Sequence, residues 1–542
     1  MIFELTQDNR HLKLVDEISD KEMTKLKRFF HRKAANFFFD PRFKAGIWDG
    51  HDDFVHDGYV AVGLWKELKA FMETNCYPVR MGGLDRMFDL SLQREEFDEF
   101  VNEIILGTKI TEPRWFQSEC AFRILKYRYC MAELATSSGK TLISYLIATY
   151  LKRAGKIDRD NKFVMIVPRA DLIGQTADKF DLDYNNGTVP LKVARIGGKF
   201  NPRTKKSIKA VDEADVVIAT YQTLGNMDRE FFERVRHVNV DEAHTTTNNT
   251  IRSILRQCTN LMYRFGLSGT LEIETGTADY CRLQEYLGPN IMIVTAKDLI
   301  DGNYSPDIFI KTIKLQYDEH EDITVRDYMD LIDNGREMYV NADEFGKAMY
   351  QLERQIIINH PARMEFMVSL IRGLKMNTLI LFHDVKGKYG RTIYEKLIEN
   401  GERAYYIDGA VSGGDREDYR LAIEKYNDVK LIASFGTFST GMDIKNVYNI
   451  IFTESYKSPI LIRQSIGRGM RELIGKYSVN IIDIVDTFGK YAAKHYRERK
   501  ATYKSQQFPI VETKYDMSAI TLDDACKHAL GHQILLDEFM RL

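Results

Sequence analysis

Short apolar runs, each followed at once by a polar or glycine-containing motif, constrain this chain more than any other feature of its sequence. The first series is FVMIV (163–167) before PRADLIGQ, DVVIA (215–219) before TYQTL, and VNV (238–240) before DEAH. The second series is NTLILFH (377–383), KLIASFGTFSTGMD (430–443), YNIIFTES (448–455) and VNIIDIVD (479–486). Such runs, alternating with helical stretches such as TLISYLIATYLKRAG, are typical of parallel sheets covered on both faces. Ligands of such sheets bind beyond the carboxyl ends of the strands, where each of these motifs is expected.

The two series predict two tandem α/β domains with parallel sheets, at residues 107–305 and 306–488. We expect residues 1–106 to form a small α+β accessory domain and residues 489–542 to form a short helical C-terminal extension. The length of 542 residues suits three or four domains, because one domain takes roughly 150 residues.

Composition limits the cellular compartment and the binding partners that we expect for this chain. The formal net charge is −2, so any nucleic-acid-binding surface must be local. The six cysteines show no C-x-x-C spacing, which indicates buried thiols in a reducing compartment. The chain begins without a signal-peptide pattern, and no apolar run approaches the length of about 18 residues that indicates a membrane helix. We therefore expect a cytoplasmic protein that does not contact a membrane.

ATSSGKT, residues 135–141, resembles the second half of a phosphate-binding loop. Such loops follow the pattern G-x-x-x-x-G-K-[ST], in which backbone amides and a lysine surround the phosphates. Gly139, Lys140 and Thr141 fit the pattern, whereas Leu134 occupies the position of the first glycine. The alternative is a helix N-terminus that happens to follow Ser-Ser-Gly, and the heptad alone does not decide between the two.

DEAH, residues 241–244, favours the phosphate site. It follows an apolar strand about a hundred residues after the loop, as a second phosphate-site motif does when it comes from a neighbouring strand. Lys140 would bind the β- and γ-phosphates of ATP, and Thr141 and Asp241 would hold Mg²⁺. Glu242 would orient and deprotonate the attacking water. A solvated turn is the alternative for a lone Asp-Glu pair, but the apolar strand and the upstream loop argue against it.

QSIGRGMR, residues 464–471, places Arg468 and Arg471 three positions apart, on one face if the segment is helical. Two such arginines can stabilise charge on a transferring phosphoryl group across a cleft, an effect worth roughly 10³–10⁵ in rate. Surface salt bridges are the alternative, but they do not explain why Gln464 accompanies both arginines.

Eight motifs in order resemble the series of the superfamily 2 helicases and translocases: RWFQ (114–117), ATSSGKT, PRADLIGQ, TYQTL, DEAH, LSGT, FSTGMD and QSIGRGMR. Each motif is weak to moderate alone, but eight in order are very specific, and they cover about residues 110–475. The resemblance implies two RecA-like domains that clamp ATP between them. FFFDPRFKAGIWDGHDDF (37–54) is also similar to the N-terminal domain of a phage recombination helicase, which extends the resemblance to almost the whole chain.

The resemblance also implies roles for individual residues. Gln117 would read adenine with Arg114 nearby, while His244, Ser268 and Thr270 would couple hydrolysis to domain movement. The implied nucleotide-binding set is Arg114, Gln117, Thr136, Ser137, Ser138, Gly139, Lys140, Thr141, Gly441, Asp443 and Gln464. Arg468 and Arg471 would act as arginine fingers.

Nucleic acid is expected on the same edge of the first sheet. The resemblance implies contacts, mostly with phosphates and hence without base-sequence information, by Pro168, Arg169, Thr220 and Gln222. Residues 192–210 contain seven Lys or Arg and no acid. Gly197 in this segment could let a backbone amide meet a phosphate, although a solvated loop is the alternative.

Two further segments leave alternatives open. Helical spacing puts His495, Arg499 and Tyr503 on one face, where they would either grip nucleic acid or pack on the second domain. Residues 25–50 interleave basic and aromatic side chains, which can bind single strands. We expect most of these aromatic residues in the core of a small domain, with Trp48 as a packing and hairpin residue.

Together these features predict an ATP-dependent DNA helicase or translocase that uses ATP and Mg²⁺ on forks, Holliday junctions and R-loops in phage recombination, repair and replication. Expected partners are single-stranded or branched DNA, RNA within R-loops, and phage recombination proteins, with the protein a monomer in the cytoplasm of a bacterial host. The alternatives are an RNA helicase, a duplex translocase without strand separation, and a non-catalytic nucleic-acid clamp. Lys140, Glu242, Arg468 and Arg471 argue against the clamp.

Overall fold

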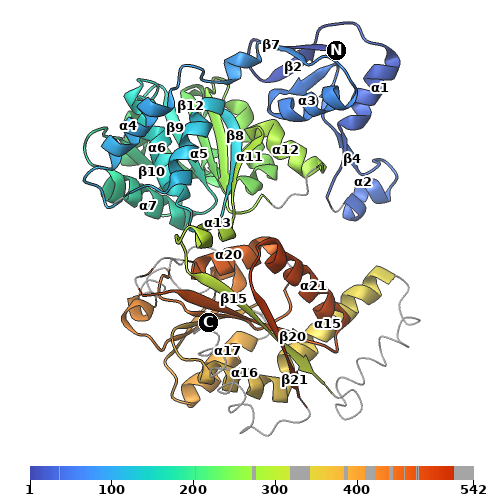
Figure 1. Cartoon of the computed structure of the whole chain (residues 1–542), viewed down its shortest axis with the longest axis vertical. Coiled ribbons are helices and arrows are strands. Elements are labelled where there is room, and N and C mark those ends of the chain that lie inside the picture. The colour runs from blue at the N-terminus through green and yellow to red at the C-terminus, as the bar shows by residue number, and fades with distance from the viewer. Residues whose placement is uncertain are drawn as a thin grey trace. The chain divides into compact units, whose positions relative to one another are not determined.

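The computed structural model describes residues 1–35, 37–110, 112–201, 203–271, 276–317, 342–383, 388–408, 419, 421–438, 444–456, 458–470, 473 and 475–517. The chain divides into two compact units, Met1–Val294 and Thr295–Leu542 (Figure 1). Each unit contains a seven-stranded parallel sheet, and the first also contains a small domain with antiparallel strands. The predicted fold class is therefore confirmed. The first unit holds the predicted accessory domain together with most of the first α/β domain, whose limits stay predictions.

The first unit begins with a mixed sheet of order β5-β6-β2-β1-β7. Its strands are β1 (Ile2–Leu5), β2 (His11–Leu14), β5 (Val55–His56), β6 (Tyr59–Ala61) and β7 (Arg80–Gly82). Helices α1 (Asp20–Phe29) and α3 (Trp65–Thr74) pack apolar side chains such as Leu26 and Phe71 into the same core as Phe3. Helix α1 begins where Ser19 and Glu22 form a capping box, which satisfies backbone donors that have no partner within the helix.

A separate two-stranded ribbon, β3 (His31–Lys33) and β4 (His51–Asp53), carries the basic and aromatic segment between its strands. Phe30 is buried, and Phe29, Phe37 and Trp48 pack against the same core, while Phe38 and Phe39 are exposed. The Trp48 indole N–H donates to the carbonyl of His51. Packing is therefore the role of most of these aromatic residues, and Trp48 supports the hairpin as expected.

The accessory domain packs against helix α12 (Ala278–Leu287), a helix of the α/β domain that contains the parallel sheet of the first unit. Ala278 and Cys281 of this helix lie in the apolar core of the accessory domain. Arg282 forms an ion pair with Asp52 of strand β4. These contacts explain why the two predicted domains form one compact unit.

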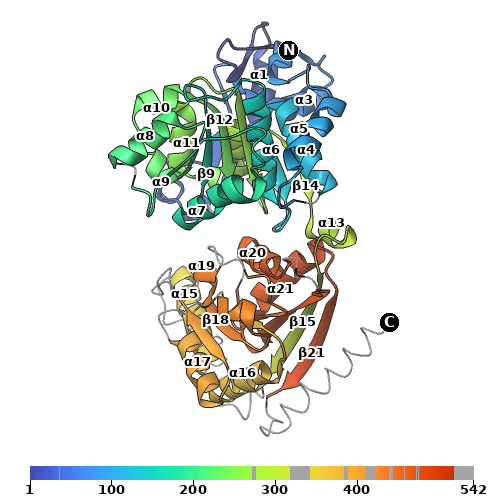
Figure 2. The ribbon, with the colours of Figure 1, turned by 90° about the vertical axis from the view of Figure 1, so that its left-hand side faces the viewer.

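The parallel sheet of the first unit has the order β10-β11-β9-β12-β13-β8-β14. Its strands are β8 (Tyr129–Leu134), β9 (Lys162–Val167), β10 (Val193–Ile196), β11 (Val216–Thr220), β12 (Val235–Asp241), β13 (Tyr263–Ser268) and β14 (Asn290–Val294). The helices are α4 (Arg94–Ile105), α5 (Trp115–Tyr127), α6 (Lys140–Arg153), α7 (Ala170–Asp178), α8 (Lys205–Glu213), α9 (Tyr221–Leu224), α10 (Arg229–Glu233), α11 (Asn249–Gln257) and α12. Helices α6 and α11 lie on opposite faces of the sheet (Figure 2). Every residue of β9 and β11 is buried, as the uninterrupted apolar runs predict.

The second unit has the sheet order β17-β18-β16-β19-β20-β15-β21. Its strands are β15 (Asp307–Gln316), β16 (Thr378–Phe382), β17 (Ala404–Ile407), β18 (Lys430–Ser434), β19 (Asn449–Phe452), β20 (Ser478–Asp486) and β21 (Ile510–Asp516). The helices are α13 (Ala296–Asp301), α15 (Ala342–Asn359), α16 (Pro361–Gly373), α17 (Tyr389–Glu399), α19 (Phe435–Phe438), α20 (Pro459–Gly469) and α21 (Lys490–Ser505). Among the helices within the described ranges, none has the length and apolar character needed to cross a lipid bilayer.

The predicted C-terminal extension begins with helix α21 but continues as strand β21, which pairs with β15 from Ile310↔Ile510 to Gln316↔Asp516. Residues 510–516 therefore complete the second sheet. On α21, His495, Arg499 and Tyr503 are buried, and Arg499 Nε lies 2.9 Å from Asp483 Oδ2 on β20. Packing on the second domain is thus the correct alternative for this helix face.

Candidate nucleotide and nucleic-acid site

The motifs predicted to bind ATP follow three neighbouring strands of the first unit. The phosphate loop follows β8, the acidic pair begins at the end of β12, and Ser268 ends β13, which lies between them. The register pairs Asp241 with Leu267 and Ser268 with Glu133. The three motifs therefore leave the sheet at the same level, as expected for neighbouring strands of a parallel sheet.

Leucine at position 134 fits the loop without strain because it is the last residue of strand β8 and is fully buried. The left-handed conformations that close the loop occur later, at Ser137 (φ 73°) and Gly139 (φ 85°), and the Ser138 amide donates to the Ala135 carbonyl at 3.1 Å. Helix α6 then begins at Lys140, where its amino end favours anions such as phosphate. The missing first glycine therefore leaves the turn intact.

Gln117 and Arg114 hold the phosphate loop in place through hydrogen bonds to its backbone carbonyls. The Gln117 side-chain amide donates to the Ser138 carbonyl at 2.7 Å, and Arg114 Nη1 donates to the Ser137 carbonyl at 2.9 Å. The Gln117 carbonyl oxygen accepts from the Arg114 amide at 2.9 Å. A Cβ at Gly139 would lie 2.2 Å from Gln117 Nε2, so glycine is required here by space as well as by φ. Adenine would have to compete with these bonds for the Gln117 amide.

The sequence did not predict this bracing, because the contacts join a helix start to a loop some 20 residues later, at Ser137 and Ser138. The only sequence signal is the presence of Arg114 and Gln117 in a motif shared with other ATPases of the family. That signal marks a role near the nucleotide but does not distinguish contact with adenine from contact with the loop.

Asp241 and Glu242 differ in electrostatic environment although they are adjacent. Burial raises the pKa of Asp241, and the neighbouring Glu242 carboxylate adds to the effect. Burial also acts on Glu242, but Lys140, His244 and Ser268 hold its pKa below the ordinary value. The Lys140 Nζ lies 3.9 Å from Glu242 Oε1. Two neighbouring carboxyls with opposite pKa shifts are typical of sites in which the two groups have different roles.

Ser268 connects the acidic pair to the next loop. Its hydroxyl lies 2.9 Å from His244 Nδ1, 3.2 Å from Glu242 Oε2 and 2.8 Å from the Thr270 carbonyl. Burial lowers the pKa of His244 even though Glu242 opposes the shift, so the imidazole is neutral near pH 7. The three residues expected to couple hydrolysis to movement are therefore in one hydrogen-bonded group with Glu242.

The loop after β13 also lies against the phosphate loop. A Cβ at Gly269 would lie 3.3 Å from Thr136 Oγ1 and 3.5 Å from Lys140 Nζ. Within the described residues, the buried hydroxyls of Ser138 and Thr270 have no hydrogen-bond partner. Unpaired buried hydroxyls are costly unless a ligand or water completes them, so both are consistent with a polar ligand at this edge.

The residues predicted to contact nucleic acid follow three further strands of the sheet, β9, β11 and β10. Arg169 is partly buried, with Nε 3.3 Å from Asp171 Oδ1, whereas Gln222 is exposed. Thr220 is buried, and its hydroxyl caps helix α9 and lies 3.0 Å from Thr223 Oγ1. Pro168, which follows β9 directly, is partly exposed.

Gly197 requires a correction. Its amide donates to the Phe200 carbonyl at 2.7 Å within a tight turn, so it is not directed at a phosphate. The glycine is needed because φ is 109° and a Cβ would lie 2.5 Å from Thr223 Oγ1. Of the seven basic residues in this segment, Arg195 is paired with Asp178 and Asp181, each at 2.7 Å. The exposed basic residues near the turn are Lys199, Arg203, Lys205 and Lys206.

In the second unit, the described part of the predicted site is helix α20. Gln464 lies on α20 and is partly exposed. The backbone of Arg468 follows one turn later, but its side chain lies outside the described residues, as do Arg471, Gly441 and Asp443. Their predicted roles therefore stay predictions.

Comparisons with known proteins find several similar sequences and structures. Residues 93–273 match the family described as Type III restriction enzyme, res subunit. The chain is 27% identical over 532 residues to the ATP-dependent DNA helicase UvsW of Enterobacteria phage T4, covering 95% of this chain and 98% of that protein. It is 22% identical over 287 residues to the probable helicase D10 of Escherichia phage T5, covering 53% of this chain and 57% of that protein. The crystal structure of T4 UvsW superposes with a TM-score of 0.47 at 24% identity, covering 95% of this chain and 100% of that chain.

Proposed function

We propose that this ATP-dependent helicase, whose motif series resembles that of the superfamily 2 helicases, unwinds or branch-migrates branched DNA. The proposed substrates are forks, Holliday junctions and R-loops, and the proposed setting is phage recombination, repair and replication. The full-length similarity to a DNA helicase of phage T4 supports this choice over an RNA substrate.

One observation carries the proposal: the carboxyl edge of the first parallel sheet has two chemically different halves. Strands β8, β13 and β12 carry the phosphate loop, Ser268 and the acidic pair, whereas β9, β11 and β10 carry exposed polar and basic residues. The halves meet where β12 pairs with β9. A change at the nucleotide can thus reach the nucleic-acid half through directly bonded strands.

At the nucleotide half, we assign the phosphate contacts to Lys140 and to the amides of the loop that Gln117 braces. Thr141 and Asp241 would hold Mg²⁺, because a cation beside the partly buried Asp241 carboxyl would offset the desolvation and the Glu242 charge that raise its pKa. When bound, this ion offsets charge on the phosphate oxygens. Glu242 would orient the attacking water and accept its proton, and its lowered pKa keeps the carboxylate ionised near neutral pH.

Ser268 would couple ATP hydrolysis to movement of the loop that follows β13. When Glu242 gains a proton, it becomes a poorer acceptor for the Ser268 hydroxyl at 3.2 Å, and the alternative acceptor, the Thr270 carbonyl at 2.8 Å, is favoured. This switch would shift the loop that rests on Thr136 and Lys140. In the second unit, we assign arginine-finger roles to Arg468 and Arg471 and nucleotide contacts to Gln464, Gly441 and Asp443.

At the nucleic-acid half, Pro168, Arg169, Thr220 and Gln222 would form the strand-binding track, with exposed lysines around Lys205 adding charge. Such contacts with phosphates carry no base sequence. The protein would therefore select DNA by its branched shape, acting as a monomer together with phage recombination proteins.

A panel of fork, Holliday-junction, R-loop and plain duplex substrates, assayed with and without ATP, tests the proposal. We expect ATP-dependent conversion of the branched substrates, no conversion by Lys140→Ala, and ATPase stimulation by forked or single-stranded DNA. Stimulation by RNA alone would favour an RNA helicase. Stimulation by duplex without strand separation would favour a translocase, and binding without hydrolysis would favour a clamp.

A further inference from the structure

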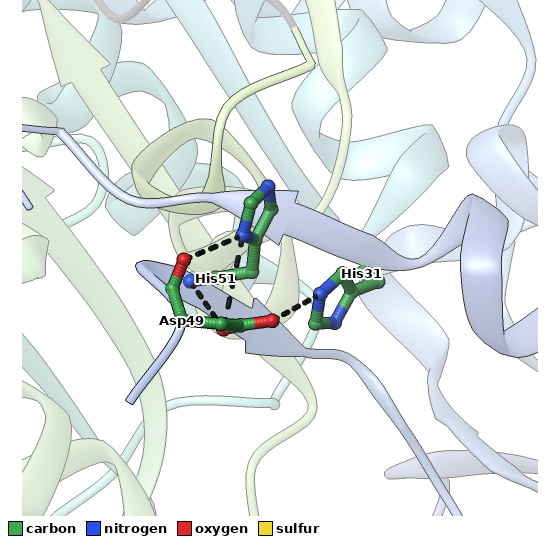
Figure 3. Close-up of side chains that lie close together, drawn as sticks. All are labelled: His31, Asp49 and His51. Carbon is green, nitrogen blue, oxygen red and sulfur yellow. Dashed lines mark hydrogen bonds and ion pairs between the residues drawn. The ribbon is translucent and has the colours of Figure 1, made fainter. Parts of the chain in front are cut away.

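We propose that the accessory domain binds a zinc ion through His31, Asp49 and His51. This proposal concerns a site in the β3–β4 ribbon, which contains none of the motifs expected to bind nucleotide, and does not depend on the proposed function. Figure 3 shows the three side chains directed toward one another.

The strand register brings the two histidines together. In the antiparallel pair, His31 lies opposite Asp53 and Lys33 lies opposite His51. Since alternate residues of a strand share a face, His31, His51 and Asp53 project from one face of the ribbon. The two imidazole rings are nearly parallel, with centroids 4.5 Å apart. Asp49 reaches the same point from the turn just before β4.

The distances between the possible ligand atoms are close to those of a zinc site. His31 Nε2 lies 2.9 Å from Asp49 Oδ2, and His51 Nδ1 lies 3.7 Å from Asp49 Oδ1. One ligand atom from each of the three residues lies within 4.8 Å of the others. Tetrahedral zinc with bonds of roughly 2.0–2.1 Å separates its ligand atoms by about 3.3 Å, which lies between the 2.9 Å and 3.7 Å found here. Two imidazoles and one carboxylate are a ligand set that zinc accepts, leaving a fourth position for water.

A second carboxylate supports the assignment. Asp53 Oδ1 lies 2.8 Å from His31 Nδ1 and accepts the Nδ1–H. The Nε2–H donates to Asp49 Oδ2 at 2.9 Å, and this proton would be released when Nε2 binds the ion. Histidines that bind metals commonly donate their other N–H to such a carboxylate, which fixes the tautomer and the ring orientation. Asp53 is therefore a positioning residue of the proposed site.

The site would close the base of the segment that joins β3 to β4. His31 precedes residues 34–48, and Asp49 and His51 follow them, so one ion would join both ends of the segment. A cross-link of this kind restricts the loop conformations. The loop carries Phe38 and Phe39, which are 49% and 56% exposed. Histidine and aspartate side chains that are 34–60% exposed leave the ion a route from solvent.

The test is a zinc titration of the full-length protein after chelation, with excess Mg²⁺ present to occupy the nucleotide site. Calorimetry and metal analysis should find one zinc per chain. The variants His51→Ala and Asp49→Asn should each weaken binding by about tenfold or more, and Asp53→Asn by about tenfold. The matched control is His56→Ala, an exposed histidine on β5, which should bind as the wild type does.

Cobalt(II) provides a second readout, because its visible absorption reports tetrahedral coordination by the protein. The band should appear in the wild type and in His56→Ala and be lost in His51→Ala, with circular dichroism showing that each variant is folded. The proposal is overturned if the wild type binds no zinc, or if His51→Ala and Asp49→Asn bind as tightly as the wild type. It is also overturned if His56→Ala weakens binding equally, since the ion would then be held by dispersed surface histidines.

Discussion

Replacing Gln117 with leucine tests how the phosphate loop is held. The Gln117 amide is buried and donates to the Ser138 carbonyl at 2.7 Å, while its carbonyl accepts from the Arg114 amide. Leucine has a similar volume but cannot form either bond. Each buried polar group left without a partner costs about 1–3 kcal/mol. The variant loop should therefore leave the conformation in which its amides can meet phosphates.

If the binding-competent loop becomes the minor state, nucleotide affinity falls by the same free energy. A cost of about 1–3 kcal/mol corresponds to a loss of about 5- to 150-fold. The loss should be equal for ATP and GTP, because the brace contacts the loop and not the base. Titrations with fluorescent ATP and GTP analogues, without nucleic acid, measure both affinities.

The matched control is Gln93→Leu, since Gln93 is an exposed glutamine of the same unit whose amide also bonds a carbonyl, that of Ser91. This control should leave both affinities unchanged. A Gln117→Leu protein that binds GTP as the wild type does, but has lost its preference for ATP, would refute the bracing argument. That result would instead support recognition of adenine by Gln117.

Four further outcomes are expected. Lys140→Ala should abolish ATP hydrolysis and leave DNA binding in gel-shift assays largely intact, and persistent hydrolysis would show that residues 135–141 are not the phosphate loop. Arg471→Ala should lower kcat far more than nucleotide affinity, because an arginine finger acts mainly in the transition state; equal losses would make it a binding contact. Arg499→Met removes the charged partner of the buried Asp483 carboxylate, to which the Tyr503 hydroxyl still donates, so the free energy of unfolding in urea should fall by about 3–5 kcal/mol. A loss of DNA affinity at unchanged stability would contradict the packing role. Burial lowers the pKa of His237 to about 4 from an ordinary 6.5, so the unfolded state binds an extra proton as the pH falls from 6.5 toward 4. Over this range the free energy of unfolding of the wild type should fall by about 3 kcal/mol relative to that of His237→Gln. Parallel curves of stability against pH for the two proteins would disprove this.

The sequence by itself determined the fold class and the edge of the sheet that carries the motifs. Apolar runs such as 163–167 and 215–219 predict buried parallel strands because a strand covered on both faces needs no polar alternation. Motifs placed directly after such runs, like DEAH after 238–240, must emerge at the carboxyl edge. Both inferences depend only on neighbours along the chain, which is why the order of the residues is enough to support them.

Tertiary structure decided which of these segments meet. The strand order, with β13 between β12 and β8, brings Ser268 beside Glu242, and no local pattern contains that order. The same applies to β21, whose pairing with β15 joins residues about 200 positions apart.

Roles of single side chains were decided at the same level. Arg499 is a residue type that commonly contacts nucleic acid, yet its burial against Asp483 makes it a core residue. The pairing of His31 with Asp53 likewise depends on ribbon register, because a shift by one residue would turn the histidines to opposite faces. Long-range pairing selects partners from the whole chain, whereas a sequence window records only the preferences of its own residues.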